Sequence, residues 1–128
     1  MAIKETDYTN ATDILVAPEL AFAIPVIVTN ASVTADSEGK KIIKAGTPLY
    51  ASADIFMNRE TKMTTVSTAN TVYGIARWDI DVTDGDTNAT LLVAGYVDYL
   101  KLDSTVQTAV DTAKTTLTRI LFIKGRKA

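Results

Sequence analysis

Four closely spaced aspartates have the clearest potential for chemistry in this sequence. They are Asp79, Asp81, Asp84 and Asp86. Carboxylate oxygens can bind calcium or magnesium, and a pair of carboxyl groups can act as general acid and base. Counted from Asp79, however, an EF-hand loop would have Thr83 at its fifth position and Asp84 at its sixth, where it needs an acidic residue and a glycine. We therefore interpret the group as a solvated turn around Gly85, because aspartate and glycine favour turns for backbone reasons.

The chain contains no histidine and no cysteine, which removes most nucleophilic and metal-ligand chemistry. Disulfides, thiolate nucleophiles and cysteine-bound metal centres are excluded. Ser52 and Ser104 would need a lysine as base, and neither has one at the Ser-x-x-Lys spacing. The six glycines are scattered and form no phosphate-binding loop. The sequence thus predicts a protein that is not an enzyme, with no cofactor, no bound metal and no small-molecule substrate.

The charge balance predicts neither a nucleic-acid partner nor a membrane partner. The 128 residues have a formal net charge of -2, whereas both kinds of partner need a positive face. The small basic groups are Lys40, Lys41 and Lys44, and separately Lys124, Arg126 and Lys127. The most apolar window, residues 20–29, is far shorter than the roughly 20 residues that span a bilayer. The mixed charges of the first residues do not resemble a signal peptide.

The first half of the chain has the pattern of an arm followed by short strands. Residues 1–19 show no helical or strand period, and we expect them to form an arm that is mobile in the free protein. Residues 20–29 are rich in β-branched side chains and predict a strand, with a second short strand at 32–35. A turn at 36–39 precedes another extended segment at 41–44. Residues 54–70 are expected to form a loop, because no clear period is present.

The second half predicts an antiparallel hairpin, one helix and a closing strand. The hairpin consists of residues 72–80 and 89–97, joined by the aspartate-rich turn. Asp103 has N-cap chemistry, and the apolar residues that follow recur at helical spacing. Residues 119–124 read as the closing strand. The fold class is therefore β-rich α+β: a small, compact, antiparallel body, barrel-like or clip-like, with one C-terminal helix. Residues 20–128 form its single domain.

The aromatic residues are expected in the core or in subunit contacts, because most lie in predicted strands. They are Tyr50, Phe56, Tyr73, Trp78, Tyr96 and Tyr99. A body without catalytic residues, joined to a long polar arm, suits recognition of another protein by strand addition to a sheet edge. The residues therefore predict binding and not catalysis.

Several segments, taken in order, resemble the head decoration proteins of lambda-type bacteriophages. The segments are Lys4-Glu-Thr, Ala45-Gly-Thr-Pro-Leu, Val72-Tyr-Gly-Ile-Ala, Asp79-Ile-Asp-Val-Thr-Asp-Gly-Asp and Leu91-Leu-Val-Ala-Gly-Tyr-Val-Asp. The resemblance spans nearly the whole chain. It implies a homotrimer at threefold and quasi-threefold positions of the expanded head, where it holds the major capsid protein lattice against internal DNA pressure. It also implies a location on the outer surface of the virion, after synthesis in the host bacterial cytoplasm.

The resemblance also assigns a binding role to the arm. Capsid contact is expected at Ile3, Lys4, Glu5, Thr6 and Tyr8, with Ile14, Leu15 and Val16 as further apolar anchors. The segment 20–35 is longer and more strand-like than the loose arm of the lambda protein. Two alternatives remain open, namely a tail-tube or fibre subunit of a virion and a small carbohydrate-binding β-module. The second rests on Trp78 alone.

Overall fold

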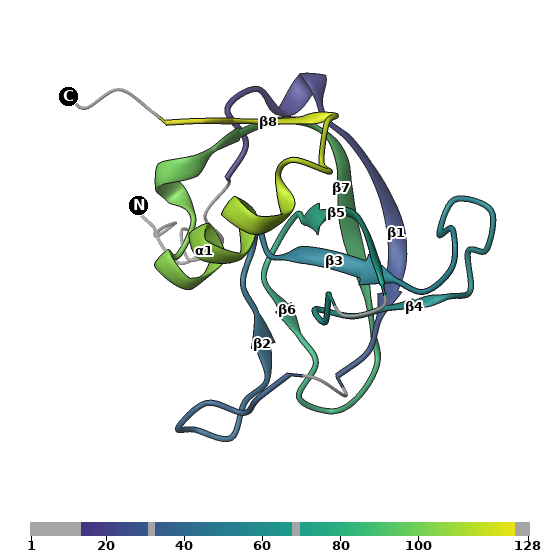
Figure 1. The fold of residues 1–128 in the computed structure, drawn as a ribbon. Helices are drawn as coiled ribbons and strands as arrows, with labels where there is room; N and C mark the ends of the chain where they lie inside the picture. The colour runs from purple at the N-terminus through teal and green to yellow at the C-terminus, as the bar shows by residue number, and fades with distance from the viewer. Residues whose placement is uncertain (1–13, 31–32, 68–69, 125–128) are drawn as a thin grey trace, which may run out of the picture.

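The structure is a computed structural model that describes residues 14–30, 33–67 and 70–124 of the chain. The described part contains eight strands and one α-helix, and Figure 1 shows how they are arranged. The strands are β1 (Phe22–Val28), β2 (Ile42–Ile43), β3 (Pro48–Ala51), β4 (Lys62–Met63), β5 (Thr71–Ala76), β6 (Ile80–Asp81), β7 (Thr87–Asp98) and β8 (Ile120–Ile123). The helix α1 is Ser104–Ala113, and two 3-10 turns are η2 (Pro18–Leu20) and η3 (Tyr99–Lys101).

Strand β7 is the centre of a six-stranded sheet with the order β3-β5-β7-β1-β4 and with β8 beside the end of β7. Strands β2 and β6 form a separate two-stranded ribbon. The pairs β1–β4 and β7–β8 are parallel, and the other pairs are antiparallel. The β-rich α+β class is confirmed, although two of the pairings are parallel rather than antiparallel. The described strands form a compact sheet and no closed barrel; Tyr50 and Thr64 make a single bridge between its two edges.

The two longest strands form where the sequence is richest in β-branched and aliphatic residues. Strand β1 pairs with β7 over its whole length, from Phe22 opposite Ala94 to Val28 opposite Thr87. Strand β4 pairs only with the last two residues of β1, so Pro25 lies where that side of β1 has no strand partner. This position suits proline, which has no amide proton to donate to a neighbouring strand. The carbonyl of Pro25 instead accepts a hydrogen bond from the Arg59 guanidinium.

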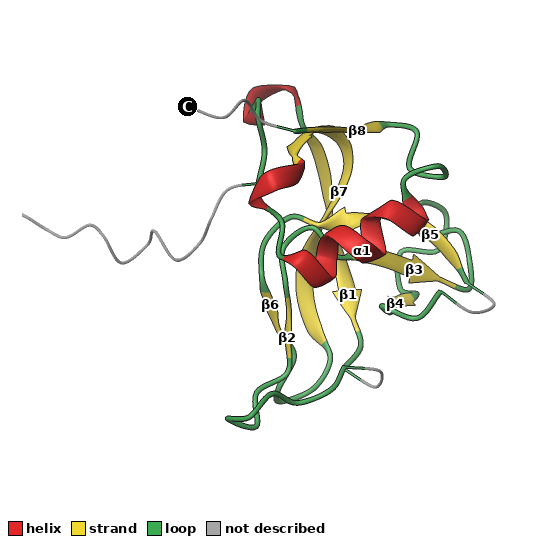
Figure 2. Ribbon diagram, turned by 60° about the vertical axis from the view of Figure 1, so that its left-hand side comes forward, coloured by secondary structure: helices red, strands yellow, loops and turns green. Residues whose placement is uncertain are grey.

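The helix begins and packs as its spacing predicts. Asp103 is the N-cap, and its carboxylate accepts a hydrogen bond from the Thr105 amide at 3.2 Å. Val106, Val110 and Ala113 are its buried residues, and Figure 2 shows α1 lying across one face of the sheet. Leu117, which also fits the helical spacing, lies beyond the end of the helix but is still buried.

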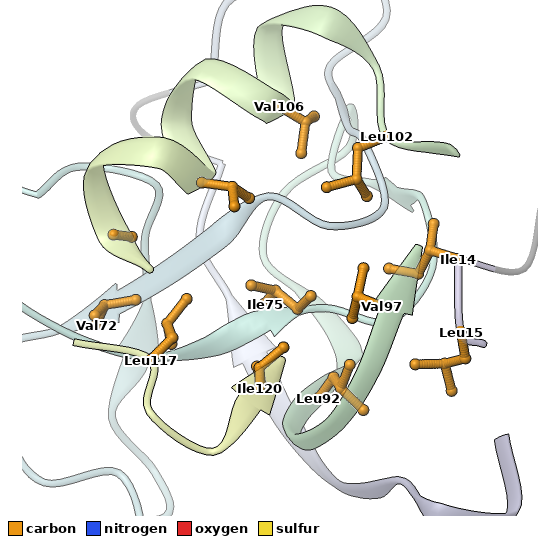
Figure 3. Packing of buried hydrophobic residues seen from close by; sticks show 12 residues of the cluster. Ile14, Leu15, Val72, Ile75, Leu92, Val97, Leu102, Val106, Leu117 and Ile120 are labelled. Atoms are coloured by element: carbon orange, nitrogen blue, oxygen red, sulfur yellow. The ribbon is translucent and has the colours of Figure 1, made fainter. Parts of the chain in front are cut away.

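Two buried clusters lie on the two faces of the curved sheet. The first joins α1, β8 and the N-terminal segment to the sheet (Figure 3). Its members are Ile14, Leu15, Val72, Ile75, Leu92, Val97, Leu102, Val106, Val110, Ala113, Leu117 and Ile120. The second lies between the sheet and the β2–β6 ribbon, with Val28, Leu49, Ile55 and Met63 among its most buried members. Strand β7 contributes Leu92 to the first cluster and Leu91 to the second, so both of its faces are covered there.

Several local expectations differ from the structure. The strand expected at 72–80 is divided into β5 and β6, which belong to different sheets. Residues 33–35 form no strand, and β4 lies within the segment expected to be a loop. The body also begins earlier than expected: Ile14 and Leu15, placed in the arm, are only 1% and 5% exposed. Their burial has a backbone cause, because Leu15 bridges to Val97 and the Ile14 carbonyl accepts a hydrogen bond from the Asp98 amide at 2.8 Å. Residues 1–13 lie outside the described residues, and among the described ones the buried body extends to Ile14.

Candidate functional site

Three of the four aspartates in the β6–β7 region have partners, and each has a different one. The Asp79 carboxylate accepts a hydrogen bond from the Ala45 amide at 2.7 Å, and the Asp81 carboxylate accepts one from the Thr83 amide at 2.9 Å. Asp86 forms an ion pair with Lys62 at 2.7 Å. Within the described ranges, no group of three or more acidic, histidine or cysteine side chains could hold a metal ion. The aspartates therefore act as turn and ion-pair residues in this geometry.

Two of these aspartates have a pKa below the ordinary value. The Thr83 hydroxyl, followed by the Thr83 amide, lowers the pKa of Asp81. The Lys62 ammonium lowers the pKa of Asp86, with a further contribution from the Thr29 hydroxyl. Both carboxylates are therefore stabilised in their charged form, which is the opposite of what a general acid at neutral pH needs.

The other residues considered for chemistry lie in structural positions. Ser52 is exposed in the bend after β3, and Ser104 is exposed in the first turn of α1. Lys40, Lys41 and Lys44 follow the turn at Asp36. The Asp36 carboxylate accepts a hydrogen bond from the Lys40 amide at 3.0 Å, and the charges of Lys40 and Lys44 help to lower its pKa. That surface is thus mixed in charge and not basic.

The aromatic residues mostly contact other side chains. The rings of Phe56 and Tyr73 meet edge to face, with centroids 5.8 Å apart. The Arg77 guanidinium lies 3.9 Å from the centroid of the Trp78 ring. A shallow groove beside Trp78 is lined by residues of β6 and of the start of β7. This cation–π contact covers one of the two ring faces that a sugar-binding tryptophan could offer to its ligand.

The residues expected to bind a capsid fall into three groups. Ile3, Lys4, Glu5, Thr6 and Tyr8 lie outside the described residues. Ile14 and Leu15 are core residues, so the assignment of these two as surface anchors is corrected: their side chains already fill the cluster beneath α1. Val16 is exposed, and its amide donates a hydrogen bond to the Tyr96 carbonyl at 2.9 Å. Of the expected contact residues that the structure describes, only Val16 is exposed.

A row of exposed apolar side chains crosses three neighbouring chain segments at the C-terminal end of β7. Val16, Tyr96 and Leu121 lie side by side, because Val16 is bonded to Tyr96 and Tyr96 is the register partner of Leu121. Ile123 shares the face of Leu121, two positions along β8, and exposed Phe22 extends the row toward β1. We call these five residues the outer apolar face. Sequence reasoning missed it, because an unbroken run such as Ile120-Leu-Phe-Ile does not show which of its side chains are buried.

A groove lies on the other side of β8, between this strand and α1. It is lined by Tyr99, Asp111, Lys114, Ile120, Leu121, Phe122 and Lys124. The Tyr99 hydroxyl donates a hydrogen bond to Asp111 at 2.8 Å, and this bond raises the pKa of Tyr99. The Lys124 ammonium lies 5.8 Å from the centre of the Tyr99 ring. Strand β8 therefore has an apolar outer face and a polar, largely cationic groove beside its inner face.

Comparison with models of known protein families, with curated protein sequences and with solved structures finds no match to this chain. Among the helices of the described residues, none is long and apolar enough to cross a membrane.

Proposed function

We propose that this protein is a head decoration protein of a bacteriophage. It binds as a homotrimer at threefold and quasi-threefold positions of the expanded head and holds the major capsid protein lattice together against the pressure of the packaged DNA. The observation that carries the proposal is the attachment of the N-terminal segment. Because Ile14 and Leu15 are fixed to β7, the preceding thirteen residues start from a defined point on a stable body.

Three of the five segments that carry the resemblance to lambda-type decoration proteins support the proposal by their positions. The segment from Ala45 leads into β3, the segment from Val72 forms β5, and the segment from Leu91 is the C-terminal part of β7. These are adjacent strands of one sheet. Of these three segments, the one in β7 holds the strand residues to which the N-terminal segment is bonded.

A second candidate function is a tail-tube or fibre subunit. The observation in its favour is the open edge of β8, since a strand edge can add copies of the same chain without limit. The size of the purified protein separates the two functions. A decoration protein is a discrete monomer or trimer in solution, whereas a tube subunit forms polymers at raised concentration.

The direct experiment mixes the purified protein with empty expanded heads and with unexpanded procapsids from the phage that carries its gene. We expect the protein to sediment with expanded heads, to saturate at one trimer for each local threefold position, and to stay in the supernatant with procapsids. Absence of binding to either particle rejects the proposal. Equal binding to both rejects the specificity for the expanded lattice.

A further inference from the structure

Strand β8 has a free edge that can pair with another strand. It is bound to β7 on one side, and the Gly95 amide donates a hydrogen bond to the Arg119 carbonyl at 3.2 Å. Successive residues of a strand direct their peptide groups to opposite sides, so the peptide groups of Leu121 face β7 and those of Phe122 face away from it. No strand of the described chain pairs with that outer side. The amide and carbonyl of Phe122 are therefore available to an added strand.

The surroundings of this edge fit an added strand on both faces. Side chains that point outward from such a strand would continue the outer apolar face beyond Leu121, which is 56% exposed, and Ile123. Side chains that point inward would enter the groove between β8 and α1. Strand addition of this kind obtains affinity from backbone hydrogen bonds and specificity from the alternate side chains.

The charges of the groove determine which side chain fits it. Lys114 and Lys124 line the groove together with a single acid, Asp111. The carboxylate of Asp111 already accepts the Tyr99 hydroxyl and lies 3.9 Å from the Lys114 ammonium. Arg119 is exposed where the chain enters β8. A cationic excess therefore remains, and an incoming carboxylate is favoured over an incoming ammonium.

We propose that the outer edge of β8 binds an extended segment of the major capsid protein. The segment pairs its backbone with Phe122, places apolar side chains beside Leu121 and Ile123, and directs an acidic side chain toward Lys114 and Lys124. Only the source of the segment rests on the proposed function. The edge, the apolar face and the cationic groove do not depend on it.

Two synthetic peptides test the site without capsids. Both peptides have blocked, uncharged termini and a sequence of alternating threonine and valine. They differ only at the central residue, which is glutamate in one and lysine in the other. Titrated into the isotope-labelled full-length protein, the glutamate peptide should shift the backbone amide resonances of Phe122 and Lys124 and bind at least about tenfold more tightly than the lysine peptide. In the double variant Lys114→Glu/Lys124→Glu the preference should reverse. Peptides that leave β8 unperturbed, or that bind without regard to charge, overturn the proposal.

An edge variant then links the site to the capsid. Leu121→Lys places a charge on the exposed face beside the edge, a substitution that discourages strand pairing. It should reduce binding to expanded heads at least about tenfold, whereas Met57→Lys, at a side chain 79% exposed on the loop between β3 and β4, should not. Equal binding by the two variants overturns the assignment of the capsid segment to β8. Self-association that Leu121→Lys abolishes identifies a second copy as the occupant and likewise overturns it.

The two experiments separate this inference from the proposed function. A protein that sediments with expanded heads but fails the peptide test retains the decoration role and loses the β8 site. A protein that binds the glutamate peptide at β8 but no head retains a peptide-binding edge and loses the decoration role.

Discussion

Gly46 has a backbone conformation that other residues rarely adopt, with φ at +92°, and it leaves room for the Leu102 side chain. We predict that Gly46→Ala destabilises the protein by about 3 kcal/mol, because it combines a strained φ with overpacking against Leu102. Gly39→Ala is the matched control. Gly39 also has a positive φ, of +79°, but an added methyl group would meet nothing within 4 Å. Its cost should be about 1 kcal/mol in urea unfolding, and equal losses for the two variants would refute the steric argument.

Because of the aspartates at turns and caps, we expect the folding stability of the protein to decrease at acidic pH. The pKa of Asp86 is lowered first by Lys62, and the pKa of Asp103 is lowered first by the Thr105 hydroxyl. A carboxyl group whose folded-state pKa is lowered contributes stability above its unfolded pKa, near 3.9, and loses that contribution as the pH falls through the folded pKa. We therefore predict a constant thermal midpoint above about pH 5 and a progressive loss between about pH 4 and about pH 2.

The Asp86 part of this loss can be isolated by a double-mutant cycle. Asp86→Asn and Lys62→Met should each reduce the acid-dependent change in the free energy of unfolding. The double variant should show no further reduction beyond that of Asp86→Asn alone, because Lys62 acts through its ion pair with Asp86. Fully additive effects would show that Lys62 acts on acid stability through groups other than Asp86.

At the scale of elements, the N-terminal segment attached to β7 contains both a core residue, which should affect folding stability, and a surface residue, which should not. Ile14 is 1% exposed in the core beneath α1, whereas Val16 is on the surface. We predict that Ile14→Ala costs about 3 kcal/mol of folding stability, since it leaves a cavity, and that Val16→Ala costs less than about 0.5 kcal/mol. Thermal or urea unfolding measures both.

Two truncations extend the same argument. Deletion of residues 2–13 should leave the melting temperature nearly unchanged and weaken binding to expanded heads at least about tenfold. Deletion of residues 2–16 should also lower the melting temperature, because it removes Ile14 and Leu15 from the core. If the shorter deletion decorates heads as tightly as the full chain, residues 2–13 do not bind the capsid.

The elements that the sequence predicts well are those whose own residues determine them. Strands β1, β5 and β7 are rich in β-branched residues, and α1 has a capping aspartate and a regular apolar spacing. The missed elements depend on distant partners. Strand β4 has two residues and pairs with the end of β1, and Leu15 is fixed by Val97 on a strand far along the chain. The residue pattern of a short segment does not indicate which distant strand it will pair with.

The candidate site was hard to predict for the same reason. The outer apolar face joins Val16, Phe22, Tyr96 and two residues of β8, which come from three separate parts of the sequence. The expected contact residues Ile14 and Leu15 have the same apolar character as Val16. Only the pairing with β7 decides that the first two point into the core and that the third is exposed.

At the scale of the whole molecule, both proposed attachments lie at one end of β7. The Asp98 amide donates a hydrogen bond to the Ile14 carbonyl, and Asp98 is also the register partner of Ile123 on β8. The N-terminal attachment and the free strand edge are thus on opposite sides of the same strand (Figure 1). In the proposed decoration role, each copy would contact the capsid through two nearby features, and the proposed trimer would do so at three neighbouring subunits.

This arrangement predicts stabilisation through several weak contacts. Once one copy of a trimer is bound, the contacts of the other two form at a high effective concentration. A protein that binds the assembled shell in preference to free subunits shifts the equilibrium toward the shell. We predict that DNA-filled heads with bound protein release their genome at a higher temperature than heads without it.

The measurement follows genome release by dye fluorescence while filled heads are heated. Heads saturated with the full-length protein should release DNA several degrees above bare heads, and heads mixed with the protein lacking residues 2–13 should release it at an intermediate temperature. That deletion weakens each contact of the trimer but leaves the folded body and its β8 edge in place. Equal release temperatures at confirmed full occupancy would exclude a cementing role, since a bound protein that does not favour the intact shell cannot hold it against pressure.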